Sequence, residues 1–480
     1  MRAHVLTYGC QMNEYDTLTI QSELVSGGHE LVDAPQDAEL LLLNTCAVRG
    51  KPVEKVVSLL GDLRKERRKG RKLAIGLMGC LAQLDEGRSI ARKFGVDVVI
   101  GPGAITDILP AIEQLEERRA RGGARLHHAG QPEPASKAAP GGSAGGPAMA
   151  DPAGPIEALR FRDDLAQHLT PPPPVGTQTG FVTIMRGCDH HCTYCIVPDT
   201  RGPEVSRPLS VIVQEVQAMR DAGVQEVVLL GQNVNSYGLG DPELPSFAEL
   251  LRLVAQLGVP RVKFTTSHPM NFTSDVIDVI RDEPNVCDYI HLPVQSGSDR
   301  VLRRMAREYR RERYLGIVRE IRNKVPDVVL STDIIVGFPG ETEEDFEQTL
   351  TLFDEVRFEH AYTFIYSARP GTPAHRHFDD MPREVKTERL GRLIERQKHW
   401  SLEANRRWIG RSVRVLVKDR AKDGAYVAGH SDQNHTVLVP ADQIRRLGLH
   451  AVRVEHATPH ALYGVVEGER EDAIPLRLAS

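Results

Sequence analysis

The chain has 480 residues, of which 41% are hydrophobic and 26% are charged, and its formal net charge is −5. This length predicts roughly two to four domains, and a net negative charge excludes a generally basic nucleic-acid coat. No apolar run approaches the roughly 18 residues of a membrane span, and MRAHVLTYGC lacks the apolar core of a signal peptide. Seven cysteines without a secretion signal indicate a reducing compartment, so we expect a cytoplasmic protein that does not enter a membrane.

Three apolar runs in residues 1–118 each end at a cysteine. HVLTYGC, ELLLLNTC and KLAIGLMGC end at Cys10, Cys46 and Cys80, and helix-like segments lie between them. Such alternation predicts a parallel sheet covered by helices, in which ligands bind beyond the carboxyl ends of the strands. A lone free cysteine is most often a core residue, but three in equivalent positions indicate a shared site. We therefore predict an α/β domain whose three cysteines hold an iron–sulfur cluster with one open iron.

The next segment is rich in small residues and proline. Residues 121–160 contain 8 Gly, 6 Pro and 10 Ala, and four consecutive prolines begin at Pro171. Such a segment buries too little apolar surface to offset its ordering entropy. We predict a flexible linker over residues 119–172.

Six apolar runs separated by amphipathic segments predict a partial (β/α) barrel of the TIM type over residues 173–408. The functional groups of such barrels lie at the carboxyl ends of the strands. For each polar candidate, a satisfied core polar group is the alternative interpretation. The lone Cys287 is expected in the core. The polar candidates are Gln232, Asn233, Ser267, His268, Gln295, Ser296 and Asp333.

The run GCDHHCTYC places Cys188, Cys192 and Cys195 on one short loop. Three thiolates can hold three irons of a four-iron cluster, and the fourth iron then stays open for a substrate or cofactor. The alternative is a structural zinc site closed by His190 or His191, because three cysteines and a histidine form a complete tetrahedral set.

Residues 383–410 are expected to form a connecting helix, and the short alternating runs of residues 409–472 predict a small β-barrel. It is similar to an OB-fold, a common platform for single-stranded nucleic acid, although a purely structural β-domain explains the pattern equally well. Arg-rich stretches at 61–72 and 301–325 add modest support for a polyanionic partner. Each is also typical of a solvated helix face.

The loop spacing, with Tyr194 before the last cysteine, resembles the cluster loop of radical S-adenosylmethionine (SAM) enzymes. Two three-cysteine sites followed by a small barrel resemble the radical-SAM methylthiotransferases across nearly the whole chain. Strings such as YGCQMNEYDT, NTCAVR, CTYCIVPDTRGPEVSRP, LGQNVNSYG and STDIIVGFPGET resemble the branch that modifies N6-(dimethylallyl)adenosine at position 37 of tRNA. Asp199 in place of a usual tyrosine and Gly50 in place of a usual glutamate are departures that touch no cysteine.

The resemblance implies an enzyme that replaces a C–H of this adenosine by C–S–CH3. A carbon radical made from SAM removes the hydrogen, so the cofactors carry the chemistry and no side chain is expected as a catalytic acid or base. Two four-iron clusters are implied. Cys188, Cys192 and Cys195 would hold the cluster that cleaves SAM, and Cys10, Cys46 and Cys80 would hold an auxiliary cluster that carries the inserted sulfur.

Further site residues are expected from the same resemblance. Tyr194 is expected beside the adenine of SAM, and Gln232, Asn233, Ser267 and Asp333 are expected to contribute to cofactor binding. Three arginines flank the loop and could hold phosphates or the SAM carboxylate, with ordinary surface ion pairs as the alternative. They are Arg186, Arg201 and Arg207.

The implied domain roles are a methylthiotransferase domain over 1–118, a radical-SAM barrel over 173–408 and an RNA-binding TRAM-like barrel over 409–472. The expected partners are the tRNA anticodon loop and a flavodoxin- or ferredoxin-like reductant, and the chain is expected to be a monomer. The sulfur donor is not indicated. Three alternatives stay open: a methylthiotransferase for threonylcarbamoyl adenosine of tRNA, one for a ribosomal-protein aspartate, and a non-enzymatic zinc-dependent RNA-binding protein.

Overall fold

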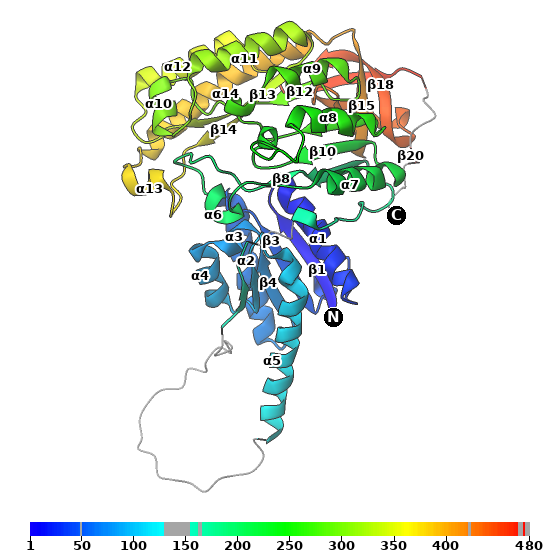
Figure 1. Cartoon of the computed structure of the whole chain (residues 1–480), viewed down its shortest axis with the longest axis vertical. Coiled ribbons are helices and arrows are strands. Elements are labelled where there is room, and N and C mark those ends of the chain that lie inside the picture. Colours follow the sequence, from blue (N-terminus) through cyan, green and yellow to red (C-terminus); the bar gives the residue numbers. More distant parts are fainter. Residues whose placement is uncertain (49, 129–153, 162–165, 421–423, 469–473, 476–480) are drawn as a thin grey trace. The chain divides into compact units, whose positions relative to one another are not determined.

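A computed structural model describes residues 1–48, 50–128, 154–161, 166–420, 424–468 and 474–475 (Figure 1). The chain forms two compact units. The first unit comprises residues 1–170 together with 199–202, and the second unit comprises residues 171–198 together with 203–480. No helix of the described ranges is both long and apolar enough to cross a bilayer.

The first unit is built on a six-stranded sheet with the order β2-β1-β3-β4-β5-β6, in which every pairing is parallel. Its strands that precede the three cysteines, β1, β3 and β4, are therefore neighbours. This arrangement confirms the predicted parallel α/β domain. The strands are β1 (Arg2–Tyr8), β2 (Glu30–Leu31), β3 (Leu40–Thr45), β4 (Ala74–Met78), β5 (Val98–Ile100) and β6 (Ile156–Ala158).

Helices cover both faces of this sheet because successive side chains of a strand point to opposite faces. Leu40 and Leu42 of β3 belong to a core cluster with α1 (Gln11–Ser26) and α5 (Ile108–His128). Leu41 and Leu43 belong to a second cluster with α2 (Gly50–Arg68) and α4 (Asp85–Phe94). A strand buried on both faces explains why its sequence is a continuous apolar run.

The segment expected as a linker over 119–172 differs from that expectation at both ends. Helix α5 continues to His128, and β6 pairs with β5 as the last strand of the sheet. Thr170 is buried and donates a hydrogen bond to the hydroxyl of Tyr15 on α1 at 2.7 Å. Alanine is the best helix former, so a composition rich in alanine does not exclude a helix. Residues 129–153 lie outside the described residues.

The second unit contains two three-stranded parallel sheets, with the orders β11-β10-β7 and β12-β13-β14. Strand–helix alternation around them confirms the predicted partial barrel. The strands are β7 (Thr179–Thr183), β10 (Glu226–Leu230), β11 (Arg261–Phe264), β12 (Tyr289–His291), β13 (Val329–Val336) and β14 (His360–Ile365). The helices between them are α7 (Leu209–Asp221), α8 (Phe247–Gln256), α9 (Ser274–Asp282), α10 (Asp299–Arg304), α11 (Arg311–Lys324) and α12 (Glu343–Val356).

A small β-barrel follows helix α14 (Arg383–Arg406), as predicted. It closes because β15 pairs with both β16 and β18, while β19 pairs with both β17 and β18. Buried Glu226 at the start of β10 binds Lys418 of this barrel at 2.9 Å, so the small barrel packs at the amino ends of the strands. Its strands are β15 (Ser412–Arg420), β16 (Tyr426–Ser431), β17 (Thr436–Pro440), β18 (Arg446–Ala457) and β19 (Leu462–Val466).

Candidate functional site

The first unit brings Cys10, Cys46 and Cys80 together at the carboxyl ends of adjacent strands. Cys10 caps the start of α1, Cys46 follows β3, and Cys80 begins the short helix α3 (Cys80–Gln83). A hydrogen bond with Cys46 lowers the pKa of the Cys10 thiol to about 6, while the same contact raises the pKa of Cys46. Cys80 repels the charge of Cys46 and is itself repelled by that of Cys10, so all three thiols act on one another, as expected of a shared site.

Each sulfur of this trio accepts an N–H donor. The backbone of Asn13 donates to Cys10, and the backbone of Val48 donates to Cys46 at 3.3 Å. Cys80 accepts from the Nε of Arg201 at 3.3 Å. Donors of this kind favour the thiolate, which is the form that binds metal.

Arg201 is buried beside the trio, at the end of α6 (Val197–Arg201). Its Nη2 pairs with Oδ2 of Asp16 at 2.7 Å, and only 4% and 1% of these two side chains are exposed. Its Nη1 is buried without a hydrogen-bond partner among the residues that the structure describes. A buried ion pair of this kind needs such close geometry, because taking both charges out of water is costly.

The backbone before Cys80 requires glycine. Gly79 has a φ of 83°, and a Cβ there would lie 2.4 Å from Oδ1 of Asn44. That amide oxygen accepts a hydrogen bond from Asn13 at 3.0 Å, so β3 and α1 are also joined. Any larger residue at position 79 would disturb the placement of Cys80.

The second unit holds Cys188, Cys192 and Cys195 on the loop between β8 (Met185–Arg186) and β9 (Val205–Ser206). These two short strands pair antiparallel and so close the base of the loop. Burial raises the pKa of Cys188 to about 11 and that of Cys195 to about 12, against hydrogen bonds from the backbones of His190 and Val197. Mutual repulsion between the thiols adds to both shifts, so this trio is also close together.

Cys192 accepts a hydrogen bond from Nη1 of Arg307 at 3.4 Å. Arg307 is buried, and it also donates to the carbonyl of Pro293 and to the hydroxyl of Tyr309, both at 3.0 Å. Arg307 therefore does not belong to the basic surface that was expected over residues 301–325. Its role was missed because the stretch 301–325 mixes buried and exposed arginines, and the helical pattern alone does not separate them.

His190 is engaged away from the cysteine trio. Its ring stacks on His268 with centroids 3.9 Å apart, its Nε2 contacts Asn271 at 3.1 Å, and its Nδ1 lies 3.6 Å from Glu308. His191 is exposed. These contacts of His190 disfavour it as the fourth ligand of a structural zinc ion.

The carboxyl ends of β10 and β11 carry four of the predicted polar residues. Oε1 of Gln232 accepts from the backbone N–H of Gly187 at 2.6 Å and so holds the start of the cysteine loop. Asn233 donates to Asn271 at 3.1 Å. In the described part of the chain, three buried polar atoms here have no hydrogen-bond partner: Oδ1 of Asn233, Oγ of Ser267 and Nε2 of His268. Burial, together with Arg307 and His190, lowers the pKa of His268 to about 2, so its ring is neutral.

The remaining predicted residues occupy different places. Tyr194 packs against a core cluster that includes Phe338 and Tyr366. Asp333 lies within β13, not at its carboxyl end, and its Oδ1 is 3.6 Å from Nε2 of His291. Gln295 is buried with a φ of 70° and forms a bridge to Ile334.

Two of the three arginines that flank the loop, Arg207 and Arg201, differ from their prediction. Arg207 is fully buried, pairs with Glu215 at 2.7 Å and donates to the carbonyl of Thr183, so it fits neither a ligand-binding role nor a surface ion pair. Arg201 contacts Asp16 and Cys80 as described above. Arg186 is half-buried.

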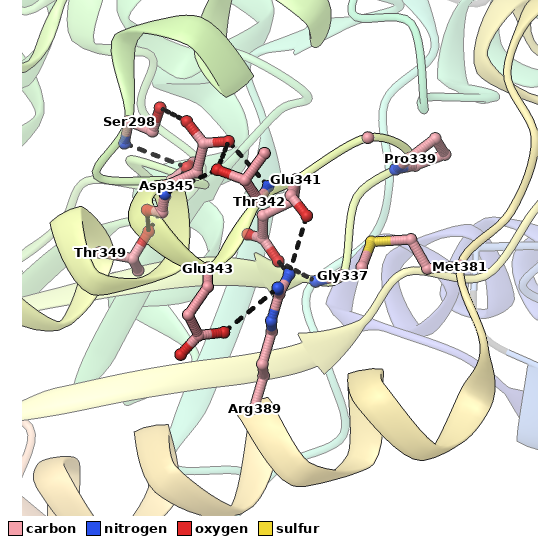
Figure 2. A network of polar contacts seen from close by, with 12 residues as sticks. Ser298, Gly337, Pro339, Glu341, Thr342, Glu343, Asp345, Thr349, Met381 and Arg389 are labelled. Carbon is pink, nitrogen blue, oxygen red and sulfur yellow. Dashed lines mark hydrogen bonds and ion pairs between the residues drawn. The ribbon is translucent and has the colours of Figure 1, made fainter.

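A polar network fixes the loop that follows β13 (Figure 2). Glu341 accepts from the backbone N–H of Gly337 at 2.7 Å and from Arg389 of α14 at 2.8 Å. Asp345 accepts from Ser298 at 2.6 Å and from the N-cap residue Thr342. This network holds the loop in place at the carboxyl end of β13, and the functional groups of such barrels lie at these strand ends.

The two trios fit iron–sulfur clusters by the chemistry of their donors. Each supplies three sulfurs, and every sulfur has an N–H donor that stabilises the thiolate. Thiolates are the ligands of such clusters, and hydrogen bonds to sulfur tune their potentials.

Comparisons with known proteins agree with this geometry. Residues 182–353 match the model of the Radical SAM superfamily, and residues 2–101 match that of the uncharacterized protein family UPF0004. The chain is 57% identical to the tRNA-2-methylthio-N(6)-dimethylallyladenosine synthase of Thermus thermophilus, covering 100% of this chain and 95% of the relative. It is 53% identical to the synthase of the same name from Deinococcus radiodurans, over 99% and 87%.

A solved structure shares the fold at low sequence identity. It is the radical S-adenosylmethionine methyltransferase TsrM from Kitasatospora setae, with a TM-score of 0.54, 15% identity, and coverage of 78% of this chain and 77% of that chain. At this identity the likeness shows a shared fold alone.

Proposed function

Because this chain belongs to the family of tRNA-2-methylthio-N(6)-dimethylallyladenosine synthases, we propose that it converts N6-(dimethylallyl)adenosine of tRNA to its 2-methylthio derivative. The identity of 57% over all 480 residues to the Thermus thermophilus synthase carries this assignment. The radical-SAM family match over residues 182–353 implies that SAM and a four-iron cluster take part. Position 37 of the tRNA is the proposed target.

We assign the cluster of the second unit to Cys188, Cys192 and Cys195. When bound, this cluster and SAM supply the carbon-radical chemistry that breaks an aromatic C–H bond. The chain's own groups position these partners. Gln232 holds the backbone at Gly187 in front of the first cysteine, and Arg307 donates to Cys192.

Asn233, Ser267 and His268 offer buried polar atoms for the cofactor or the substrate base at the neighbouring strand ends. Oδ1 of Asn233, Oγ of Ser267 and Nε2 of His268 lack hydrogen-bond partners within the described residues, and a buried polar atom is stabilised when a ligand supplies the missing bond. Tyr194 and Asp333 are proposed as further contacts of the cofactor.

A second cluster in the first unit is part of the proposal. The observation that supports it is the trio of Cys10, Cys46 and Cys80 at three adjacent strand ends, each sulfur with an N–H donor. The sulfur that is inserted into the base needs a source other than the SAM-binding iron, and a cluster held by this trio would supply it. The first unit is thus proposed as the sulfur-donating domain.

The remaining assignments concern partners. The small β-barrel of residues 409–472 is proposed to bind RNA, as OB-like barrels commonly do. A one-electron donor is required, and a flavodoxin- or ferredoxin-like protein is proposed for it. A monomer in the cytoplasm is the proposed working state.

The function is tested by nucleoside mass spectrometry. Reconstituted protein is incubated anaerobically with SAM, sulfide, a reductant and tRNA that carries N6-(dimethylallyl)adenosine. Formation of the 2-methylthio nucleoside is expected. Product formed only from threonylcarbamoyl-adenosine tRNA, or only on a ribosomal-protein aspartate, would assign the chain to another branch.

A further inference from the structure

Three arginines converge on a pocket on the surface of the second unit. Arg322 of α11, Arg357 at the end of α12 and Arg407 at the end of α14 line it. Trp400, Glu403 and Ala404 of α14 complete the lining, and the pocket has a volume of about 340 Å³. A concave site with several guanidinium groups suits a compact anion.

The positive charge of this pocket is only partly compensated. Glu403 also lines the pocket, and its carboxylate pairs with Arg406 at 2.9 Å. Glu359 is buried and accepts one bond from Arg407, at 2.9 Å. Among the described residues, the three arginines thus face two carboxylates, Glu359 and Glu403, and Glu403 is shared with Arg406. Burial lowers the pKa of Arg322, and its neighbours Arg407 and Arg357 add to this effect against the attraction of Glu359.

The guanidinium groups keep free donor capacity. Arg322 donates one long hydrogen bond, from its Nη2 to the carbonyl of Arg357 at 3.5 Å. The guanidinium of Arg357 stacks over the ring of Trp400, 4.8 Å from its centroid. The indole N–H of Trp400 donates to Asp354 at 2.9 Å, so the ring under Arg357 is itself fixed. An arginine held in this way is ready to bind without losing much side-chain freedom.

The backbone of Arg357 supports a role for its side chain. Arg357 caps the end of α12 with a φ of 54°, a left-handed conformation that glycine favours at this position. A residue with a Cβ costs about 1 kcal/mol or more there. The fold alone would be served better by glycine, and this cost supports a role for the guanidinium, which stacks on Trp400.

We propose that Arg322, Arg357 and Arg407 form a binding site for a backbone phosphate of the tRNA. This inference rests on the proposed function, which supplies the polyanion. Helix α14 leads directly from the pocket into the small barrel, where Trp408 is part of the core. A phosphate bound at Arg407 would therefore lie beside the proposed RNA platform, and it would fix the register of the tRNA without reading its sequence.

The test compares Arg357→Gly with a matched control. Arg357→Gly removes one guanidinium and relieves the left-handed backbone, so its melting temperature is expected to equal or exceed that of the parent. Arg281→Ala removes an equal charge from α9, where Arg281 is exposed and pairs with Asp278 and Asp282. The affinity of the full chain for tRNA is measured by fluorescence anisotropy from about 50 to 200 mM salt.

Arg357→Gly is expected to weaken tRNA binding about five- to tenfold at low salt and to reduce the slope of log K against log salt by about 1. Arg407→Gln should act in the same direction, and Arg281→Ala should leave both values unchanged. An unchanged affinity and slope in Arg357→Gly would overturn the proposal, as would an equal loss in Arg281→Ala.

Two further outcomes separate this inference from its premises. If Arg357→Gly instead weakens binding of a flavodoxin-like reductant and leaves tRNA binding intact, the pocket binds an acidic protein and the proposal is wrong. If the parent binds tRNA with the expected salt slope but forms no 2-methylthio product, the phosphate site stands and the proposed reaction fails.

Discussion

Each cysteine trio has a buried arginine beside it, but among the described residues only one of the two arginines is paired with a carboxylate. In each, a buried arginine donates to one sulfur: Arg201 to Cys80 at 3.3 Å and Arg307 to Cys192 at 3.4 Å. Arg201 is neutralised by Asp16 at 2.7 Å. Within the described ranges no carboxylate pairs with Arg307, which is held by a carbonyl and a tyrosine hydroxyl.

This difference shows how one chain can place two cysteine trios in different electrostatic surroundings. A buried cation acts over a longer range than an arginine–aspartate pair, because the two opposite charges of the pair largely cancel. The interior screens the remaining single charge only weakly. Arg307 therefore adds a positive charge that no carboxylate pairs with in the described ranges, although Glu204 and Asp189 act on Cys188 in the opposite direction. The Arg201–Asp16 pair adds nearly no net charge beside the trio of the first unit.

The largest effects are expected from losing a ligand in either trio. Cys188→Ala should abolish both SAM cleavage and the 2-methylthio product, because no cluster with a single open iron can then form. Cys46→Ala should abolish the product and keep SAM cleavage. 5′-Deoxyadenosine and the modified nucleoside are quantified by mass spectrometry. Normal 5′-deoxyadenosine release from Cys188→Ala would contradict the division of labour between the trios.

A large loss of stability is expected from Asp16→Asn. This change leaves the Arg201 guanidinium buried without its counter-charge, which should cost about 3–5 kcal/mol in the free energy of unfolding. Chemical denaturation of the metal-free protein measures it. Asp221→Asn is the control, because Asp221 pairs with Arg220 on the surface and its loss should cost less than about 1 kcal/mol. Equal costs would remove the contrast between buried and exposed pairs.

A moderate effect is expected on reduction potentials. Arg307→Gln removes a net positive charge beside the loop trio, so that cluster should become harder to reduce, with a potential lower by tens of millivolts. The double variant Arg201→Gln with Asp16→Asn removes no net charge and should shift the other cluster less. Titrations followed by electron paramagnetic resonance measure both. A larger shift in the double variant would contradict the charge argument.

The smallest effect concerns acid stability at the loop that follows β13. Burial opposes the charge of Asp345, but bonds from Arg300, Ser298 and Thr342 hold the pKa of its carboxyl below the ordinary 3.8. The stabilisation is therefore present above pH 3.8 and is lost as the pH falls toward the lower folded value. Asp345→Asn should cost about 1–2 kcal/mol at neutral pH and flatten the acid dependence of unfolding. An unchanged pH profile would show that the network around Asp345 contributes nothing.

Much of the site could be predicted from the sequence because its signals are local or periodic. The loop trio is visible from spacing alone. The other trio follows from three equivalent strand ends, since parallel neighbours meet at one edge of a sheet. Tertiary pairing carries no such signal. Asp16 and Arg201 meet across a separation of 185 residues, and nothing in either local sequence marks the pair. The burial of Arg207 and of Arg307 likewise has no signal in the local sequence.

The central claim, that each trio holds its own cluster, is tested most directly by anaerobic iron and sulfide analysis of three proteins. The parent should bind about eight iron and eight sulfide per chain. A variant with Cys188, Cys192 and Cys195 replaced by alanine should keep about four of each, and so should one with Cys10, Cys46 and Cys80 replaced. About four iron in the parent, or none in either variant, would contradict the claim.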